Sequence, residues 1–239
     1  MSFSPEQVEQ AFRALYVPGA QTRLRPEERR KIPELVALLT EIERTRAKRL
    51  VDAAAGRAPV GLVAAKLLGL EELLVLEHEP RRAQTASDLG QALSSRVEVR
   101  VGGVQDPSIW PERPQLVVAL HACGPASDAV IEACLRVRAK RLLLVPCCYA
   151  DKVPFAPRAR ERLDQLGVPR QAGVRRRLIE GLVDAERTLR LEAGGFEVQV
   201  VDFVPASVSP HNKLFRCRWI GNTRRADRAR EALEKLSGA

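Results

Sequence analysis

Two groups of chemically reactive side chains follow apolar segments in the middle of the chain. His121 and Cys123 come directly after the run LVVAL, and Cys147, Cys148 and Tyr149 follow the run RLLLV. Histidine is the most frequent general base in enzymes, and a cysteine thiolate is a nucleophile or a metal ligand. Both runs are typical of buried parallel strands, whose carboxyl ends meet at one edge of a sheet. We therefore take these five residues as candidate catalytic residues of one site.

A zinc site is one alternative for this group. It would use Cys123, Cys147 and Cys148 with a histidine, either His121 or His211. Zinc ligands are usually separated by two to four residues, and adjacent cysteines are awkward ligands for one tetrahedral ion. The sequence therefore favours a site without metal.

The cysteines have two further interpretations. Cys147 could act as a nucleophile, because it would lie near a helix N-terminus with a histidine base beside it. Alternatively, Cys123 and Cys147 are small buried side chains that line a cleft, since cysteine is among the most buried residue types. For Cys134 and Cys217, which lie in an apolar helix face and in a strand, we predict only this packing role.

The stretch 49–77 predicts a strand–loop–helix–strand unit, and we expect the histidine and cysteine groups to lie beside it. An apolar strand stops at Asp52, a loop of small residues centred on Gly56 follows, Pro59 suits the first turn of a helix, and a second strand ends at Glu77. Strand–loop–helix–strand units bind nucleoside cofactors at the carboxyl ends of their strands. An ordinary unit of this type with an alanine-rich turn is the alternative.

The loop indicates which cofactor fits. A phosphate-binding loop would need Lys and Ser or Thr after Gly61, where this chain has Leu62 and Val63, and the first glycine of a dinucleotide fingerprint is absent. S-adenosylmethionine is a sulfonium nucleoside without phosphate, so small residues and an acid for the ribose suffice. Asp106 would lie over the adenine or, equally, cap a turn. The candidate cofactor-binding residues are Asp52, Ala54, Gly56, Glu77, Asp106 and His121.

The remaining pattern predicts a doubly wound α/β sheet. Apolar or alternating runs predict further strands, and a late antiparallel hairpin after five strand–helix units is typical of a seven-stranded methyltransferase sheet. The expected strands beyond the first unit are 97–101, 116–120, 141–145, 196–204 and 213–220. The expected helices are 5–15, 32–42, 81–93, 127–137, 158–166, 178–191 and 224–236, with Ser127 as an N-cap and Asp128 at the positive end of its helix.

The length and the net charge of the chain limit the number of domains and the kinds of partner that we expect. The 239 residues suit one large domain, which we divide into an N-terminal helical extension, 1–30, and a methyltransferase domain, 31–239. We expect a cytoplasmic protein with reduced cysteines, because there is no secretory signal and no apolar run of membrane-spanning length. The net charge of +9 favours a polyanionic partner such as RNA, although a solvated arginine-rich surface would have the same charge.

The run VALHACGPASDAVI followed by VPCCYA resembles the His-x-Cys-Gly…Cys-Cys-Tyr/His pattern of one family of class I methyltransferases. That family includes the tRNA 2′-O-methyltransferase that acts on the acceptor stem and methyltransferase-like proteins of uncertain substrate. The resemblance extends to residues 31–34, Asp52, Gly56, Glu77 and residues 209–212. The family pattern Asp-x-Gly-x-Gly-x-Gly is not matched in full, because alanine replaces glycine at positions 54 and 58. Alanine suits a loop in which φ stays negative.

From the residues and the resemblance we expect a methyltransferase that uses S-adenosylmethionine and acts on RNA. The loop 52–58 would bind the methionine moiety, Glu77 the ribose and Asp106 the adenine, and His121 would be the base for a ribose hydroxyl. Cys123 and residues 147–149 would shape the acceptor pocket. The alternatives are a small-molecule methyltransferase and a non-catalytic RNA- or protein-binding module on a degenerate methyltransferase fold.

Overall fold

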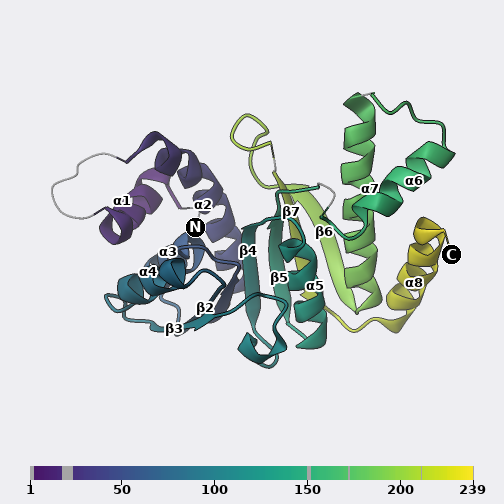
Figure 1. Ribbon diagram of the computed structural model, residues 1–239. Coiled ribbons are helices and arrows are strands. Elements are labelled where there is room, and N and C mark those ends of the chain that lie inside the picture. The colour runs from purple at the N-terminus through teal and green to yellow at the C-terminus, as the bar shows by residue number, and fades with distance from the viewer. Residues whose placement is uncertain (1–2, 18–23, 150–151, 172, 211, 239) are drawn as a thin grey trace.

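The chain folds around one mostly parallel sheet with helices on both faces (Figure 1). The computed structural model describes residues 3–17, 24–149, 152–171, 173–210 and 212–238. The strand order in the described part is β3-β2-β1-β4-β5-β7-β6, and β7 is antiparallel to both of its neighbours. The strands are β1 (Arg49–Ala53), β2 (Glu72–Glu77), β3 (Arg96–Val101), β4 (Leu116–Ala122), β5 (Arg141–Pro146), β6 (Phe196–Asp202) and β7 (Lys213–Trp219). The predicted fold class, including the antiparallel C-terminal hairpin, is confirmed.

The helices begin where the sequence supplies suitable first residues. Proline occupies the first turn of the first four, where its missing N–H costs no hydrogen bond. The Ser4 and Gln7 side chains form a capping box at the start of the first helix. The helices are α1 (Pro5–Tyr16), α2 (Pro26–Thr45), α3 (Pro59–Leu68), α4 (Pro80–Gly90), α5 (Ala126–Arg136), α6 (Ala156–Gln165), α7 (Gly173–Ala193) and α8 (Thr223–Ser237).

Alternate residues of the central strands supply two separate cores. Leu50 and Leu116 belong to a cluster with side chains of α1, α2 and α3. Their neighbours Val51 and Val117 belong to a cluster on the other face, with side chains of α5 and Leu191 of α7. This is the period of two that a sheet buried on both faces requires. Both faces are therefore closed around the middle of the sheet, and ligands must enter at its edges.

The connection from β3 to β4 contains a short 3₁₀ turn, η1 (Pro107–Ile109), and no α-helix. Ile109 and Trp110 from this segment are buried against the sheet, and the Trp110 indole N–H donates to the backbone oxygen of Val104 at 2.8 Å. The segment thus covers the part of the sheet near β2 that a crossover helix would otherwise cover.

Two boundaries differ from the prediction. The proposed division between residues 30 and 31 falls inside α2, and α1 contributes to the same core as α2 and α3. Helix α7 begins at Gly173, five residues before the expected start at residue 178. Helices α6 and α8 both pack against α7 at the end of the molecule that carries the C-terminus (Figure 1).

None of the described helices is both long and apolar enough to cross a membrane.

Candidate active site

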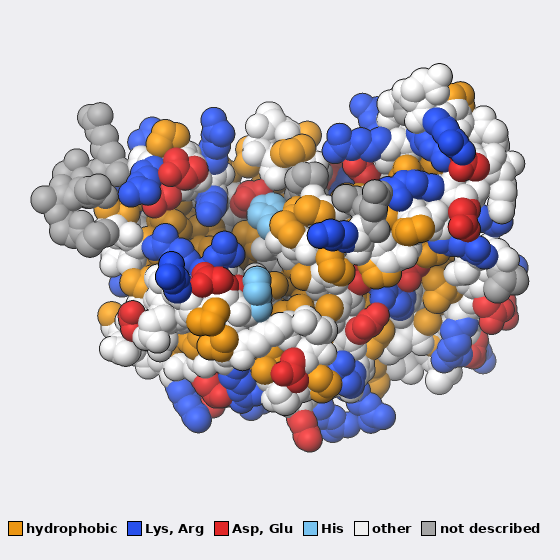
Figure 2. Space-filling model, viewed as in Figure 1, with side chains coloured by type: hydrophobic (Ala, Val, Ile, Leu, Met, Phe, Trp, Pro, Cys, Tyr) orange, Lys and Arg blue, Asp and Glu red, His pale blue; other side chains and the backbone are white. Residues whose placement is uncertain are grey.

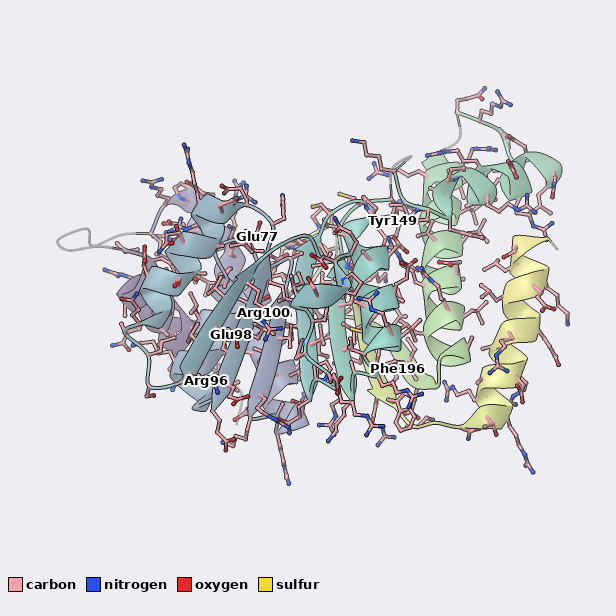
Figure 3. All side chains as sticks on the ribbon, turned by 60° about the horizontal axis from the view of Figure 1, so that its bottom comes forward. Glu77, Arg96, Glu98, Arg100, Tyr149 and Phe196 are labelled. Carbon is pink, nitrogen blue, oxygen red and sulfur yellow. The ribbon has the colours of Figure 1, made fainter. Side chains whose placement is uncertain are left out.

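The candidate residues collect at one edge of the sheet. Strands β1, β2, β4 and β5 are parallel neighbours, so Asp52, Glu77, His121 and Cys147 all lie at or next to carboxyl ends. Figure 3 shows Glu77 and Tyr149 at this edge, opposite the edge at which Arg96 begins β3. This is the edge at which ligands bind in open α/β sheets.

The start of α3 approaches β1 closely. The fully buried Asp52 carboxylate accepts a hydrogen bond from the Gly61 N–H at 2.8 Å. A Cβ at position 61 would lie 2.7 Å from the Leu73 side chain and 2.9 Å from the Asp52 carboxylate. Position 61 therefore needs glycine, because any side chain would collide with β1 and β2. The comparison with phosphate-binding loops did not predict this packing role.

The loop between β1 and α3 has a left-handed backbone at three positions. φ is +53° at Ala54, +61° at Gly56 and +56° at Ala58. The expectation that the two alanines tolerate the loop because φ stays negative is therefore wrong. A left-handed conformation costs a non-glycine residue roughly 1–2 kcal/mol. Hydrogen bonds of the loop backbone, among them Ala58 N–H to the Ala55 oxygen, hold this conformation.

Glu77 accepts one of the hydrogen bonds that hold the loop between β1 and α3. Its Oε2 accepts from the Gly56 N–H at 2.6 Å, its Oε1 accepts from the Glu79 N–H at 2.9 Å, and His78 Nδ1 lies 3.0 Å from Oε1. Glu77 is only 2% exposed. Glu77 thus holds the middle of the loop in place and lies where a ribose-binding acid is expected.

Asp52 and Glu77 place two buried carboxyl groups at neighbouring strand ends. Burial is the main cause, and the nearby Glu77 charge a further cause, of a rise in the pKa of Asp52 to about 7. Within the described part of the chain, Asp52 forms no ion pair. A buried acid without an ion pair in this part of the chain is a candidate contact for a positively charged group of a ligand.

Asp106 caps a turn. Its Oδ1 accepts from the Ser108 N–H and the Ser108 hydroxyl, both at 2.8 Å, at the start of η1. These hydrogen bonds, the backbone one first, lower the pKa of the Asp106 carboxyl. The structure thus shows the turn-capping role, and the contact with adenine stays a prediction.

His121 occupies an irregular position in β4. The register of β4 with β5 shifts between Leu120 and Ala122, and His121 itself has φ of +56°. Such irregularities redirect side chains and are frequent beside active sites. The His121 Nε2 lies 3.1 Å from each carboxylate oxygen of Glu34 in α2.

The pair of His121 with Glu34 has the form of an oriented base. Burial alone would raise the pKa of Glu34, but hydrogen bonds from His121 and Ser209 and the charge of Lys31 outweigh burial and lower it. An ionised Glu34 accepts from Nε2–H, which leaves the lone pair of the imidazole on Nδ1. Nδ1 is buried and has no hydrogen-bond partner among the described residues.

The three cysteine side chains meet beside this pair. Cys123 Sγ lies 2.8 Å from Cys147 Sγ, and Cys147 Sγ lies 3.6 Å from Cys148 Sγ. Burial first, and the neighbouring thiols in addition, raise the pKa of Cys147, and burial raises that of Cys123. A hydrogen bond from the Gly124 N–H is the main cause that lowers the pKa of Cys148. The hydrogen bonds of the described residues do not join His121 to a thiol, so the arrangement does not support a cysteine–histidine nucleophile at Cys147.

Tyr149 is held by a buried charged network. Its hydroxyl donates to Asp184 Oδ2 at 2.9 Å, and its ring lies under the guanidinium of Arg187. Burial is the main cause of a raised pKa for the Tyr149 hydroxyl and of a rise in the pKa of Asp184 to about 6. Arg187 is fully buried and donates to Asp128 at 2.8 Å. This network, which the sequence did not reveal, positions Tyr149.

The structure corrects one of the two predictions about the start of α5 and confirms the other. Pro125, not Ser127, is the N-cap residue, and the Ser127 hydroxyl donates to the Ala122 oxygen at 2.6 Å. Asp128 does lie in the first turn, but its carboxylate is buried against Arg187 and Arg190 of α7. Cys134 and Cys217 are buried, as predicted. His211, the other candidate zinc ligand, lies outside the described residues.

Two hollows flank these side chains. One, of about 450 Å³, is lined by Tyr16, Lys31, Asp52, Gly56 and His121 among others, so it joins the cofactor loop to the candidate base. Helix α1 forms a wall of it, since the Tyr16 hydroxyl donates to the Arg57 oxygen at 2.8 Å.

The second hollow, of about 870 Å³, lies between the ends of β5, α6 and α7. Cys147, Cys148 and Tyr149 form one side of it, and arginines, among them Arg170 and Arg176, form another. In Figure 2, Lys and Arg side chains gather on both sides of this face, around a middle region with many hydrophobic side chains.

Solved structures with the same fold define the class. The chain aligns with a methyltransferase from Podospora anserina, solved with S-adenosylhomocysteine, at a TM-score of 0.54 and 13% identity over 91% of this chain and 89% of that one. It aligns with a Pyrococcus horikoshii protein, provisionally described as an RNA methyltransferase, at a TM-score of 0.51 and 13% identity over 92% of this chain and 100% of that one. The fold is that of the class I methyltransferases, whose methyl donor is S-adenosylmethionine.

The sequence gives the family within this class. A family model described as a methyltransferase domain matches residues 28–152, just over half of the chain, and the chain belongs to that family. Its curated relatives include a glutathione S-transferase C-terminal domain-containing protein from Bos taurus, 32% identical over 70% of this chain, and the Homo sapiens protein of the same name, 29% identical over 70%. The chain spans 29% of the length of each.

Proposed function

We propose that this chain transfers the methyl group of S-adenosylmethionine to a hydroxyl of RNA, with His121 as the base. The observation that carries the proposal is the Glu34–His121 pair, whose histidine borders the same hollow as the cofactor loop. A base in this position is needed when the acceptor is a hydroxyl, whose proton must leave as the oxygen is methylated.

The cofactor end of the site fits S-adenosylmethionine. When bound, this cofactor supplies a methyl group on a positively charged sulfonium, and its amino-acid end carries an ammonium group beside a carboxylate. The buried carboxyl groups of Asp52 and Glu77, with no ion pair to Asp52 among the described residues, suit such a cation. The small side chains of Ala54 and Gly56 let the loop approach it closely.

Glu77 would bind the ribose hydroxyls. A carboxylate offers about four acceptor sites, and Gly56 N–H, Glu79 N–H and the His78 ring already surround this one. A ribose that donates from both of its hydroxyls must therefore displace one of these three groups from the carboxylate. The Gly56 N–H belongs to the strained loop, so we infer that cofactor binding releases this hydrogen bond and moves the loop.

The second hollow supports RNA as the acceptor. The side chains of Arg170 and Arg176 are 84% and 79% exposed, and their partners Asp164 and Glu180 are surface carboxylates. Exposed pairs of this kind contribute little stability, so phosphates can replace the carboxylates at small cost. The net charge of +9 acts in the same direction.

The first test is calorimetric titration of the full chain with S-adenosylmethionine and with S-adenosylhomocysteine. We expect micromolar binding that Glu77→Ala abolishes, because the substitution removes both the ribose acceptor and the anchor of the loop. Glu72→Ala is the matched control, since it removes the same charge from the opposite end of β2. Thermal melts of both variants show whether they are folded, and Glu77→Gln serves if Glu77→Ala is not.

The second test concerns the acceptor. Labelled methyl groups should enter RNA, and the affinity for RNA should fall about 100-fold between roughly 50 and 200 mM salt if about four phosphates are contacted. In the double variant Arg170→Ala/Arg176→Ala, the slope of log affinity against log salt concentration should decrease by an amount that corresponds to about two phosphate contacts. Arg224→Ala/Arg228→Ala on α8 removes the same charge away from the hollow and should have a smaller effect.

The outcomes separate the competing functions. Cofactor binding without methylation of RNA at any salt concentration would contradict RNA as the acceptor and favour a small molecule. Absence of binding by folded wild-type protein to both cofactor forms would show that the left-handed alanine loop has closed the site, and the chain would then be a binding module on a methyltransferase fold.

A further inference from the structure

Three cysteine sulfurs converge at the ends of two neighbouring strands. Cys123 follows β4, and Cys147 and Cys148 follow β5, whose last paired residues are Ala122 and Pro146. All three Sγ atoms lie within 4.8 Å of one another. Cys123–Cys147 is the shortest pair, at 2.8 Å, and all three cysteines are free thiols in this structure.

The three sulfurs converge as the ligands of one metal ion must. Two thiolates on a tetrahedral zinc ion, each about 2.3 Å from the metal, lie about 3.8 Å apart. The Cys147–Cys148 distance of 3.6 Å is already close to that value, and the Cys123–Cys147 pair needs to open by about 1 Å. Adjacent cysteines are awkward ligands for one ion, but here the Cys147 and Cys148 sulfurs lie 3.6 Å apart and both lie within 4.8 Å of the Cys123 sulfur.

The backbone around the sulfurs supports a ligand role. The Gly124 N–H donates to the Cys148 sulfur, and Gly124 has φ of +58°, which a side chain there would disfavour. Hydrogen bonds to ligand atoms orient metal ligands and are part of most metal sites. Cys123 is exposed, which gives an ion a path into the cluster, and the Arg187 guanidinium offsets negative charge at Cys148.

We propose that Cys123, Cys147 and Cys148 bind one zinc ion as thiolates. Three protein ligands leave the fourth position of a tetrahedral ion to solvent or to a substrate oxygen. The ion would join the ends of β4 and β5. It would lie between the first hollow, which His121 lines, and the second hollow, which Cys147 and Cys148 line together with several arginines. Binding releases the thiol protons, so affinity rises with pH.

The proposal is tested on full-length protein that has been purified with a reductant, stripped with a chelator and dialysed. We expect one zinc per chain by calorimetry, release of protons in proportion to buffer ionisation enthalpy, and a rise in melting temperature on zinc addition. Cobalt(II) should give the charge-transfer and d–d absorption bands of a tetrahedral thiolate site. These readouts do not involve methyl transfer, so they hold or fail independently of the proposed function.

Single substitutions locate the site. Cys123→Ala, the mildest because this residue is exposed, should lower zinc affinity by about 100-fold or more, since changes to the hydrogen-bond partners of ligands already cost about 10- to 100-fold. Cys148→Ala should act similarly. Cys217→Ala, a buried cysteine in β7, is the matched control and should leave the affinity unchanged.

Three results would overturn the proposal. The first is absence of stoichiometric zinc or cobalt binding to the reduced, folded chain. The second is zinc binding that Cys123→Ala and Cys148→Ala leave intact. The third is a Cys123–Cys147 disulfide found by mass spectrometry in protein purified with reductant, which would make the pair a redox couple instead of two metal ligands.

Discussion

Replacing His121 with asparagine is expected to lower the rate of methyl transfer by about 10²- to 10⁴-fold, the usual contribution of a general base. Asparagine tolerates the left-handed backbone that His121 occupies, so this substitution removes the imidazole without adding strain. The affinity for S-adenosylmethionine should change far less than the rate, because the base acts on the acceptor hydroxyl.

Glu34 should affect the same step through His121. Glu34→Gln removes the negative charge that orients Nε2–H and stabilises the protonated ring, so we expect a smaller loss of rate, of about tenfold or more. Because the pKa of Glu34 is lowered, its carboxylate stays ionised throughout the range in which an imidazole titrates.

Single-turnover kinetics across pH measures both variants. In the wild-type protein the rate should show the acidic limb of a general-base reaction, and His121→Asn should lose this limb. His78→Asn, a histidine with a 71% exposed side chain beside Glu77, is the control. A His121→Asn variant that keeps the full rate and the acidic limb would assign the base to another group.

Replacing Arg187 with methionine is expected to destabilise the fold by about 3–5 kcal/mol, because it leaves the buried carboxylate of Asp184 without its cation and Asp128 with Arg190 alone. Methionine keeps much of the volume, so most of the loss is electrostatic. For a domain of this size the melting temperature should fall by roughly 10 °C or more. Chemical denaturation at neutral pH measures the free energy of unfolding.

The pH dependence of this loss distinguishes charge from packing. In the wild-type protein the pKa of Asp184 is raised to about 6, so its contribution to stability is present at acidic pH and is lost as pH rises through that value. Without Arg187 this pKa rises further, and the variant should be least stable relative to wild type at alkaline pH. A deficit that does not shrink on acidification would indicate a packing defect. Arg176→Met, on the exposed face of the same helix, should change stability by less than about 0.5 kcal/mol.

Much of the fold could be predicted because its signals are local. Apolar runs of four to six residues marked the central strands, and prolines marked the first turns of helices. The antiparallel hairpin followed from the alternation in β6 and β7. The start of α7 was misplaced because arginines at 175–177 resemble a loop, whereas Arg175 is buried and donates to the Val168 oxygen and to Asp164.

The site was harder to predict because its partners are distant in sequence. Glu34 and His121 are 87 residues apart, and Arg187 lies 59 residues from Asp128. A signal for Glu34 was present, since an acid next to Leu35 on the buried side of α2 needs a partner. The same reasoning applies to Asp128 and Arg187, whereas the convergence of the three thiols depends on the ends of two strands and has no local signature.

The loop of left-handed alanines has a consequence for mutational tolerance. Since φ is positive at Ala54 and Ala58, what this chain shares with the glycine-rich pattern is a backbone shape instead of a residue type. Glycine and asparagine are compatible with that shape, while the β-branched residues valine, isoleucine and threonine are not. Sequence drift at these two positions is therefore restricted to a few residues, and a search for glycines alone would overlook relatives that keep the loop.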